Sequence, residues 1–149
     1  MITYREMIAL DIPILVGLEK MIFPESPWSA ALCRDVFCGV PRSRKYIVAF
    51  YGTEVIGYAG IALAGDVADI HTLTVIPTHR KQGIASKMLA ELEAWGREKK
   101  VSAFMLEMRE GNIEAQPLYE KHGYSVVSRR DNYYAPGIHA LIMRKEVEK

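Results

Sequence analysis

A short basic turn in the middle of the chain joins a predicted strand to a predicted helix. Residues 70–75 are apolar and largely β-branched, which is typical of a buried strand, and residues 84–95 repeat apolar side chains at the spacing of one helix face. Arg80, Lys81 and Gly83 lie in the turn between them. The first amides of a helix have no partners within it and attract anions, and glycine lets the backbone approach a ligand closely. The pattern therefore predicts a site for the phosphate groups of a ligand.

Residues further along the chain could transfer protons or hydrogen-bond a ligand. Glu107 lies in an otherwise apolar predicted strand, either as an outward-facing residue or as a general base tuned by partial burial. Asn112 could cap the next helix or bind a ligand. Tyr119, two helical turns later, could belong to the core or donate a proton from its phenol group. We expect Glu107 and Tyr119 to face one crevice at the carboxyl ends of two parallel strands.

The elements that carry these residues predict an α/β fold. Three strands in the first half of the chain should form an antiparallel meander, and the helix after the basic turn crosses over to a strand parallel to the last of them. The expected fold is a mixed, mostly antiparallel seven-stranded sheet flanked by about four helices, with one parallel central strand pair. The predicted strands are residues 1–5, 45–50, 55–63, 70–75, 103–108, 124–132 and 138–145, and the predicted helices are residues 11–22, 30–38, 83–100 and 113–122.

The same patterns predict local details of two helices. Asp11 is the predicted N-cap of the first helix, and Ile14 and Leu15 are expected on its buried face. Pro117 falls inside the predicted helix of residues 113–122. Because proline lacks an N–H group, we expect that helix to lose one backbone hydrogen bond and to kink.

Length and composition indicate an ordinary globular chain. The 149 residues are 50% apolar and 25% charged, and we expect residues 1–149 to form a single domain. The formal net charge of +1 provides no overall field that would attract nucleic acid or a membrane surface. No apolar run reaches the roughly 18 residues of a membrane span and no signal-peptide pattern is present, so we expect a cytoplasmic protein. Cys33 and Cys38 are expected to be reduced thiols, and no metal site is expected.

The motifs around the candidate residues resemble those of a known family. The spacing Arg80-x-x-Gly83-x-Ala85 resembles the pyrophosphate-binding signature of the GNAT N-acetyltransferases. Two downstream segments resemble later motifs of that family, in the expected order and separation: Leu106-Glu107-x-Arg109-x-x-Asn112 and Leu118-Tyr119-Glu120-Lys121-x-Gly123-Tyr124. Residues 27–29, 129–134 and 140–143 further resemble the ribosomal-protein-alanine N-acetyltransferases, the RimI group. The resemblance covers nearly the whole chain.

The resemblance implies the GNAT fold, acetyl-CoA as cosubstrate and no metal. It implies Glu107 as the proton acceptor and Tyr119 as the proton donor. It implies that a peptide substrate lies beside Trp28, Tyr133 and Tyr134, although most tryptophans of small domains pack in the core and Trp28 could do the same. The residues that it implies for acetyl-CoA binding are Leu73, Thr74, Val75, Arg80, Lys81, Gln82, Gly83, Ile84, Ala85, Ser86 and Asn112.

The resemblance also implies a reaction, the direct transfer of an acetyl group to the N-terminal alanine of a small-subunit ribosomal protein. An α-amino group has a pKa of about 7.7–8.0, so its deprotonation at neutral pH costs about 1 kcal/mol, against roughly 4–5 kcal/mol for a lysine side chain. This difference favours an N-terminal amine over a lysine. The alternatives are a lysine or small-amine acetyltransferase of the same fold and, in another class, a non-catalytic CoA-sensing module.

Two departures from the family pattern leave alternatives open. Asp69 is a second candidate base, with His71 after it, because other GNAT branches place a catalytic carboxylate early in the central strand. The chain also has Ile138 and His139 where many members of the RimI group carry an acidic residue before the final strand. The preference for a particular peptide is therefore open.

Overall fold

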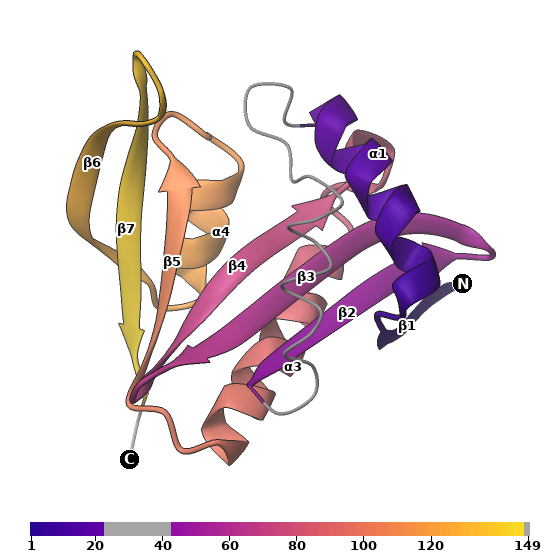
Figure 1. Cartoon of the computed structure of the whole chain (residues 1–149), viewed down its shortest axis with the longest axis horizontal. Helices are drawn as coiled ribbons and strands as arrows, with labels where there is room; N and C mark the ends of the chain where they lie inside the picture. The colour runs from indigo at the N-terminus through magenta and orange to yellow at the C-terminus, as the bar shows by residue number, and fades with distance from the viewer. Residues whose placement is uncertain (23–42, 148–149) are drawn as a thin grey trace.

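One mixed sheet forms the centre of the molecule, in a computed structural model that describes residues 1–22 and 43–147. Its strands are β1 (Ile2–Glu6), β2 (Arg44–Tyr51), β3 (Glu54–Ala64), β4 (Val67–Val75), β5 (Ala103–Arg109), β6 (Ser125–Ala135) and β7 (Ile138–Glu146). They lie in the order β1-β2-β3-β4-β5-β7-β6 (Figure 1). Every neighbouring pair is antiparallel except β4 and β5, which are parallel. The predicted seven-stranded sheet with one parallel pair is therefore confirmed.

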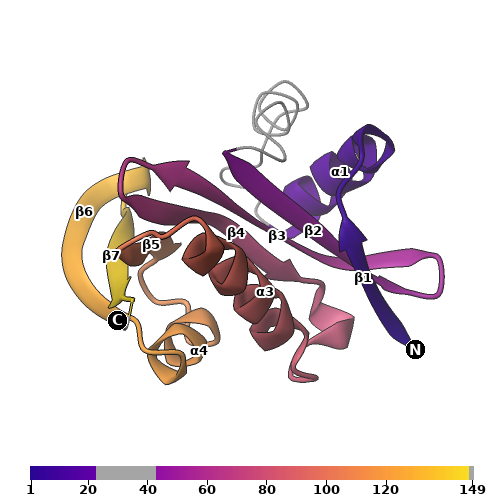
Figure 2. The same ribbon diagram turned by 90° about the horizontal axis from the view of Figure 1, so that it is seen from below.

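Helices cover both faces of the sheet. In the described residues these are α1 (Ile12–Ile22), α3 (Ile84–Glu98) and α4 (Ala115–Lys121), with short 3-10 turns at Ala9–Asp11 and Pro77–His79. Figure 2 shows α3 and α4 on one face and α1 on the other. The helix predicted over residues 30–38, together with Trp28 and both cysteines, lies outside the described residues. Within the described ranges, no helix has the length and apolar character needed to cross a bilayer.

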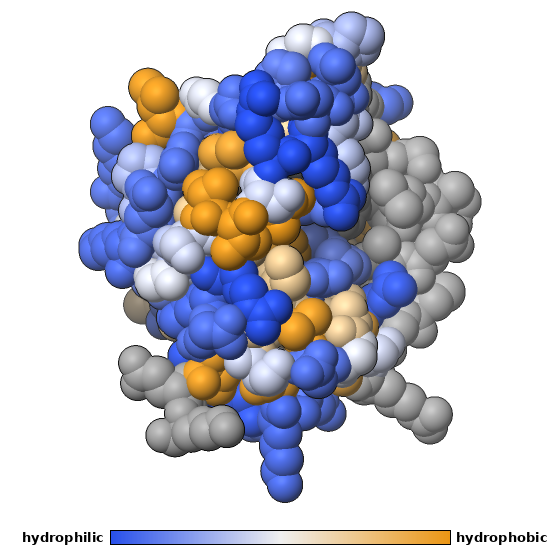
Figure 3. Space-filling model, turned by 90° about the vertical axis from the view of Figure 1, so that its left-hand side faces the viewer, coloured by the Kyte–Doolittle hydropathy of each residue, from blue (hydrophilic) through white to orange (hydrophobic). Residues whose placement is uncertain are grey.

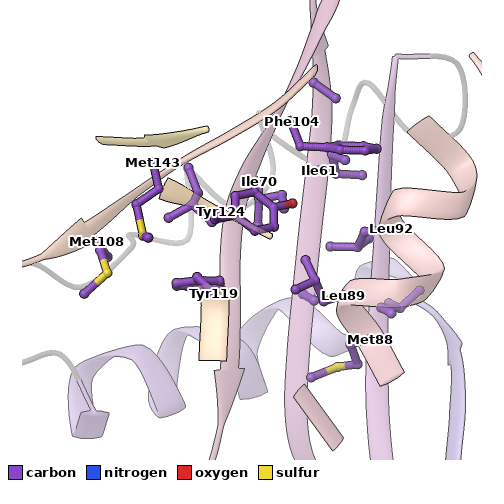
Figure 4. Packing of buried hydrophobic residues seen from close by; sticks show 14 of the residues in the cluster. Ile61, Ile70, Met88, Leu89, Leu92, Phe104, Met108, Tyr119, Tyr124 and Met143 are labelled. Atoms are coloured by element: carbon purple, nitrogen blue, oxygen red, sulfur yellow. The ribbon is translucent and has the colours of Figure 1, made fainter. Parts of the chain in front are cut away.

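The largest part of the core lies between the sheet and α3. Ile84, Met88 and Leu92 are almost completely buried, as the helical spacing predicts, and they pack with strand residues such as Phe104 (Figure 4). Fully burying an aliphatic side chain of this size contributes about 1.5–3 kcal/mol. At Gly96 a Cβ atom would collide with the ring of Phe104, so glycine lets α3 approach β5 closely. This packing fixes the start of α3 beside the end of β4.

The first helix differs from its prediction at two residues. Asp11 does not cap α1; its carboxylate instead accepts hydrogen bonds from the Arg5 guanidinium at 2.8 and 2.9 Å and from the Ile8 amide at 2.8 Å. These bonds tie β1 to the start of α1. Ile14 is 49% exposed, whereas Leu15 is buried against β2 and β3. Successive helical residues point about 100° apart, so the two neighbours lie at the edge of the buried face and only one of them turns inward.

The last helix begins later than predicted, and this removes the expected problem at Pro117. Because α4 begins at Ala115, Pro117 lies in its first turn, where an N–H group has no partner within the helix. The helix loses no hydrogen bond there. The predicted cap by Asn112 is confirmed, since its side-chain oxygen accepts from the amides of Glu114 at 3.2 Å and Ala115 at 3.0 Å. Gly123, with φ +97°, follows the helix in the left-handed conformation.

Strand β6 forms one edge of the sheet. Figure 3 looks onto this side of the molecule and shows hydrophobic side chains surrounded by hydrophilic ones. On β6 itself, Val126 and Val127 are 43% and 53% exposed. The register with β7 shifts between Val126 and Ser128 and again between Arg130 and Ala135. Such irregularities, together with charged residues, hinder pairing of an edge with another chain.

Candidate functional site

The parallel strands at the centre of the sheet separate toward their carboxyl ends. Their pairing extends only from Val67 opposite Ala103 to Ile70 opposite Leu106. Beyond these four pairs β4 continues to Val75 and β5 to Arg109, and Figure 1 shows the two arrowheads diverging. The last backbone groups of β4 therefore have no partner in β5. Ligands of α/β sheets bind in crevices of this kind, outside the carboxyl ends of parallel strands.

A pocket of about 660 Å³ lies at this position. Its walls come from the end of β4, the basic turn, the first turn of α3 and the segment from Asn112 into α4. A volume in this range suits a nucleotide-sized ligand. Gln82 belongs to the same turn but does not line the pocket, while Tyr119 does. The other residues predicted to bind acetyl-CoA all line it: Leu73, Thr74, Val75, Arg80, Lys81, Gly83, Ile84, Ala85, Ser86 and Asn112.

The backbone of the basic turn has the conformation of an anion site. Gly83 has φ +79° and Lys81 has φ +64°, a region that side-chain-bearing residues adopt only rarely. The first hydrogen bond of α3 runs from the amide of Lys87 to the carbonyl of Gly83, at 3.0 Å. The amides of residues 84–86 precede it and have no acceptor within the helix. These amides and the helix dipole favour negative charge at the pocket wall. We call residues 81–86 the anion cradle.

Arg80 links the two walls of the pocket. Its Nε donates to the carbonyl oxygen of Val75 at 3.0 Å, and its Nη1 lies 3.2 Å from Glu114 Oε2. Both partners of this ion pair are more than one-third exposed, so the pair itself contributes little to stability. Lys81 and Lys121 bring further positive charge to the lining.

Tyr119 brings a phenol group to the pocket. It lies on α4, is 7% exposed and packs edge-on against Tyr124, with 5.9 Å between the ring centroids (Figure 4). It belongs to the same core cluster as Leu106 and Met108 of β5. The packed ring holds its hydroxyl at a defined place, and a phenol can donate a proton.

Glu107 lies on the opposite face of the sheet. Side chains alternate along β5, and because Leu106 and Met108 enter the core beside α4, Glu107 points to the other side. Glu107 and Tyr119 therefore flank the gap between β4 and β5 from two sides, whereas we expected one shared crevice. Glu107 Oε1 lies 3.4 Å from Arg130 Nη1, and its side chain is 33% exposed. The Tyr133 hydroxyl also donates to it, and this bond raises the pKa of Tyr133.

The second candidate base lies near Glu107. Burial raises the pKa of Asp69, and the charge of Glu107 raises it further, while His71 opposes the shift. His71 lies at an irregularity where β3 pairing passes from Thr72 to Ile70. Burial lowers the pKa of His71, the charge of Arg44 adds to this, and Asp69 acts in the opposite direction.

Tyr46 of β2 contacts His71 of β4 across β3. The Tyr46 hydroxyl lies 2.7 Å from His71 Nδ1. A Cβ atom at Gly60 would collide with the Tyr46 ring, so the glycine is what lets that ring lie across β3. The role of Tyr46 could not be predicted from the sequence, because a tyrosine in an apolar strand gives no local signal of its cross-strand partner.

The predicted peptide-binding residues are only partly described. Tyr133 is 47% exposed and lies under Arg130, whose guanidinium carbon is 5.3 Å from the ring centroid. Tyr134 lies in β6, but its side chain is not described, and Trp28 is outside the described residues. Sequence analysis missed the contact of Arg130 with Glu107, although Arg130 lies within one of the motifs. No set of three metal-binding side chains gathers anywhere in residues 1–22 and 43–147.

Comparison with known proteins identifies the family. The model of the Acetyltransferase (GNAT) family matches residues 15–124. The chain belongs to the GNAT acetyltransferases. This assignment agrees with the anion cradle at the start of α3 and with the separation of β4 from β5 in the sheet.

Several relatives of this GNAT chain cover most of its length. N-alpha-acetyltransferase RimI of Mycobacterium tuberculosis is 32% identical over an alignment of 136 positions, which covers 87% of this chain and 82% of that one. A candidate ribosomal protein bS18-alanine N-acetyltransferase of Bacillus subtilis is 31% identical over 140 residues, 93% of this chain and 91% of that one. An uncharacterised protein of Mycobacterium leprae is 30% identical over 93% of this chain, but the match spans only 39% of that longer protein.

Solved structures share the fold. The crystal structure of Ard1 from Thermoplasma volcanium superposes with a TM-score of 0.88 over 99% of both chains, at 24% identity. The ribosomal-protein-S18-alanine N-acetyltransferase from Escherichia coli superposes with a TM-score of 0.84 over 100% of this chain and 96% of that one, at 23% identity. At these identities the likeness establishes the arrangement of helices and strands.

Proposed function

We propose that the protein is an acetyl-CoA-dependent Nα-acetyltransferase that modifies the N-terminal amine of a protein, with the N-terminal alanine of ribosomal protein bS18 as the first candidate. The observation that carries this proposal is the gap between β4 and β5, which has the anion cradle and Tyr119 on one side and Glu107 on the other. The Mycobacterium tuberculosis and Bacillus subtilis relatives support the choice of an N-terminal amine.

The residues of the pocket fit acetyl-CoA by their chemistry. The anion cradle offers amides, a helix dipole and lysine charge to a diphosphate. The edge of β4 that faces the gap, within residues 73–75, offers hydrogen-bonding groups to an extended ligand. Acetyl-CoA would supply the acetyl group in activated form, as a thioester. The protein then has to position an uncharged amine and move two protons.

The proton transfers follow from the two faces of the gap. Glu107 accepts one proton of the incoming ammonium group and passes it to solvent, and the resulting amine attacks the thioester carbonyl carbon. The C–N bond forms, the C–S bond then breaks, and Tyr119 donates a proton to the departing thiolate. The new amide nitrogen releases its second proton, which restores the Tyr119 hydroxyl. Backbone N–H groups of residues 73–75 stabilise the negative charge that develops on the carbonyl oxygen. We propose direct transfer, in which no residue of the protein carries the acetyl group.

An α-amine places a smaller demand on Glu107 than a lysine does. The Glu107 side chain is one-third exposed, pairs with Arg130 and accepts a hydrogen bond from Tyr133. Removing a proton from an α-ammonium costs only about 1 kcal/mol at neutral pH, against roughly 4–5 kcal/mol for lysine. Asp69 is the alternative acceptor, because its more buried position raises its pKa.

Release of free CoA on addition of peptide tests the proposal. The panel comprises peptides that begin with the bS18 sequence, with substitutions in the first two residues, and the same peptides with a blocked N-terminus. We expect turnover only with free N-termini, and highest with alanine first. Turnover of N-terminally blocked, lysine-containing peptides or of small amines would instead establish a side-chain or small-amine acetyltransferase. Tight CoA binding without turnover of any acceptor would indicate a CoA-sensing module.

A further inference from the structure

His122 contacts the anion cradle from outside the pocket. Its Nε2 lies 3.0 Å from Oγ of Ser86, which stands in the first turn of α3 and lines the pocket. His122 itself directly follows α4 and is half-buried. The contact joins the two helices that form opposite walls of the pocket, and Ser86 stands between the imidazole and any anion in the cradle.

A second contact fixes the same turn to α3. The Tyr124 hydroxyl donates to Glu93 Oε2 at 2.8 Å, and Lys145 Nζ of β7 lies 2.8 Å from the other oxygen of Glu93. Glu93 is 4% exposed, so this carboxylate is a buried anchor with both oxygens engaged. Between His122 and Tyr124, Gly123 adopts φ +97°, and the turn thus presents both side chains to α3. The backbone that carries His122 is therefore anchored to α3 through Tyr124.

The surroundings of His122 favour the neutral form of its ring. Burial lowers its pKa, and Lys145 of β7 and Lys121 of α4 lower it further, while Glu93 of α3 acts in the opposite direction. A neutral imidazole carries one N–H, and the direction of its bond with Ser86 depends on which nitrogen holds it. An imidazolium carries both, so its Nε2 must donate to Ser86 Oγ and the serine hydroxyl hydrogen is left to point elsewhere.

We propose that His122 is a positioning residue for CoA binding, which takes up a proton when the diphosphate enters the cradle and thereby turns the Ser86 hydroxyl toward it. The inference rests on the proposed function, since it takes CoA as the ligand. Negative charge in the cradle favours the imidazolium. By linkage, the affinity for the diphosphate then rises as the pH falls through the range in which His122 titrates.

Titration calorimetry with dephospho-CoA measures this proton directly. That probe keeps the diphosphate but lacks the 3′-phosphate, a group that itself titrates near pH 6. Binding heats at about pH 6.5 in two buffers of different ionisation enthalpy give the number of protons taken up. We expect a fraction of a proton for the wild-type protein and none for His122→Gln. His139→Gln, which alters the β6–β7 hairpin away from the pocket, should keep the wild-type uptake.

The affinities of the single and double variants for dephospho-CoA distinguish a positioning role of His122 from an effect on overall stability. His122→Gln and Ser86→Ala should each weaken dephospho-CoA binding by about threefold to tenfold, the value of one hydrogen bond, with unchanged secondary structure by circular dichroism. Combined, the two changes should weaken binding no more than either alone, since each breaks the same contact. Uptake that persists in His122→Gln, or that disappears instead in His79→Gln, would overturn the inference while leaving the proposed function intact. A wild-type protein that binds neither CoA nor dephospho-CoA would overturn the proposed function itself.

Discussion

Two carboxylates, Glu107 and Asp69, lie close enough to interact beside the gap between β4 and β5. Replacing Glu107 with glutamine keeps the shape of the side chain and removes its basicity. If Glu107 is the proton acceptor, kcat in the CoA-release assay should fall by about 10²–10⁴-fold, the usual contribution of a general base. Glu110→Gln is the matched control, because Glu110 is a neighbouring exposed glutamate whose carboxylate binds Arg129.

Asp69→Asn tests the alternative proton acceptor. If this variant loses activity while Glu107→Gln keeps it, the base is the carboxylate of β4. Activity should then decline as the pH falls through the pKa of Asp69, which burial raises above its ordinary value.

Tyr119→Phe tests the proposed proton donor. The variant keeps the ring that packs against Tyr124 and removes only the hydroxyl. We expect kcat to fall by about 10²-fold or more, with little change in peptide KM or in the Kd for CoA, because proton donation matters in the transition state. Tyr124→Phe is the control: it removes the bond to Glu93 and should lower the free energy of unfolding by about 1–3 kcal/mol while changing kcat much less. Equal losses of kcat in both variants would assign Tyr119 to the core alone.

Some site residues could be predicted from the sequence and others could not, for a physical reason. Arg80, Gly83 and Ser86 lie in one short segment at the start of α3, so their proximity follows from local geometry. The contacts of Arg130 with Glu107 and of His122 with Ser86 join residues far apart in the chain. Such contacts depend on how the helices and strands pack, and the periodicity of a single segment carries no information about them.

At the scale of elements, the junction between β4 and α3 depends on Gly83. Gly83→Asp forces a side chain into φ +79° and places a negative charge at the anion cradle. The affinity for CoA should fall at least tenfold, or by about 1.4 kcal/mol, by calorimetry. Gly65→Asp is matched to it: Gly65 has φ +65°, open space around a Cβ atom and a place in the β3–β4 turn. The Gly65→Asp variant should lose comparable stability and keep its affinity for CoA. If both variants lost the same affinity, backbone strain and not the anion cradle would explain the effect.

The strands and α3 could be predicted because each carries its own periodicity. The first and last residues of the helices were predicted less accurately. α4 begins at Ala115 although the apolar pattern and the Asn112 cap are consistent with an earlier start. For α1, the sequence does not say which of Ile14 and Leu15 faces the sheet, because that depends on where β2 and β3 lie. Which strand lies between β5 and β6 is likewise set by tertiary pairing.

At the scale of the whole molecule, the pair of Arg5 and Asp11 connects β1 to α1, and it predicts a pH-dependent stability. Burial alone would raise the pKa of Asp11, but the hydrogen bonds from Arg5 and from the Ile8 amide, together with the charge of Arg5, outweigh burial and lower it. A group whose pKa is lowered by folding stabilises the protein above its unfolded pKa of about 3.9 and loses that contribution as the pH falls through its folded pKa.

Urea unfolding of Asp11→Asn checks this prediction. At pH 7 the variant should be less stable than the wild-type protein by about 1 kcal/mol, a modest value because Arg5 is 43% exposed. Below about pH 4 the difference should shrink as Asp11 becomes protonated. Glu54→Gln, at the exposed start of β3, should have no effect at either pH. A difference that is the same at pH 7 and at pH 3 would show that the charge of Asp11 contributes nothing to stability.

The place of β7 has a consequence for how the protein is made. β7 lies between β5 and β6 although the ribosome synthesises it after both. A nascent chain therefore presents two uncovered strand edges from the moment β6 emerges until residues 138–146 follow. Glu107 stands opposite Ile142 of β7, so the strand that carries it gains its last neighbour only at that point. Until residues 138–146 have emerged, these edges are open to chaperones or to the edge of another unfinished chain.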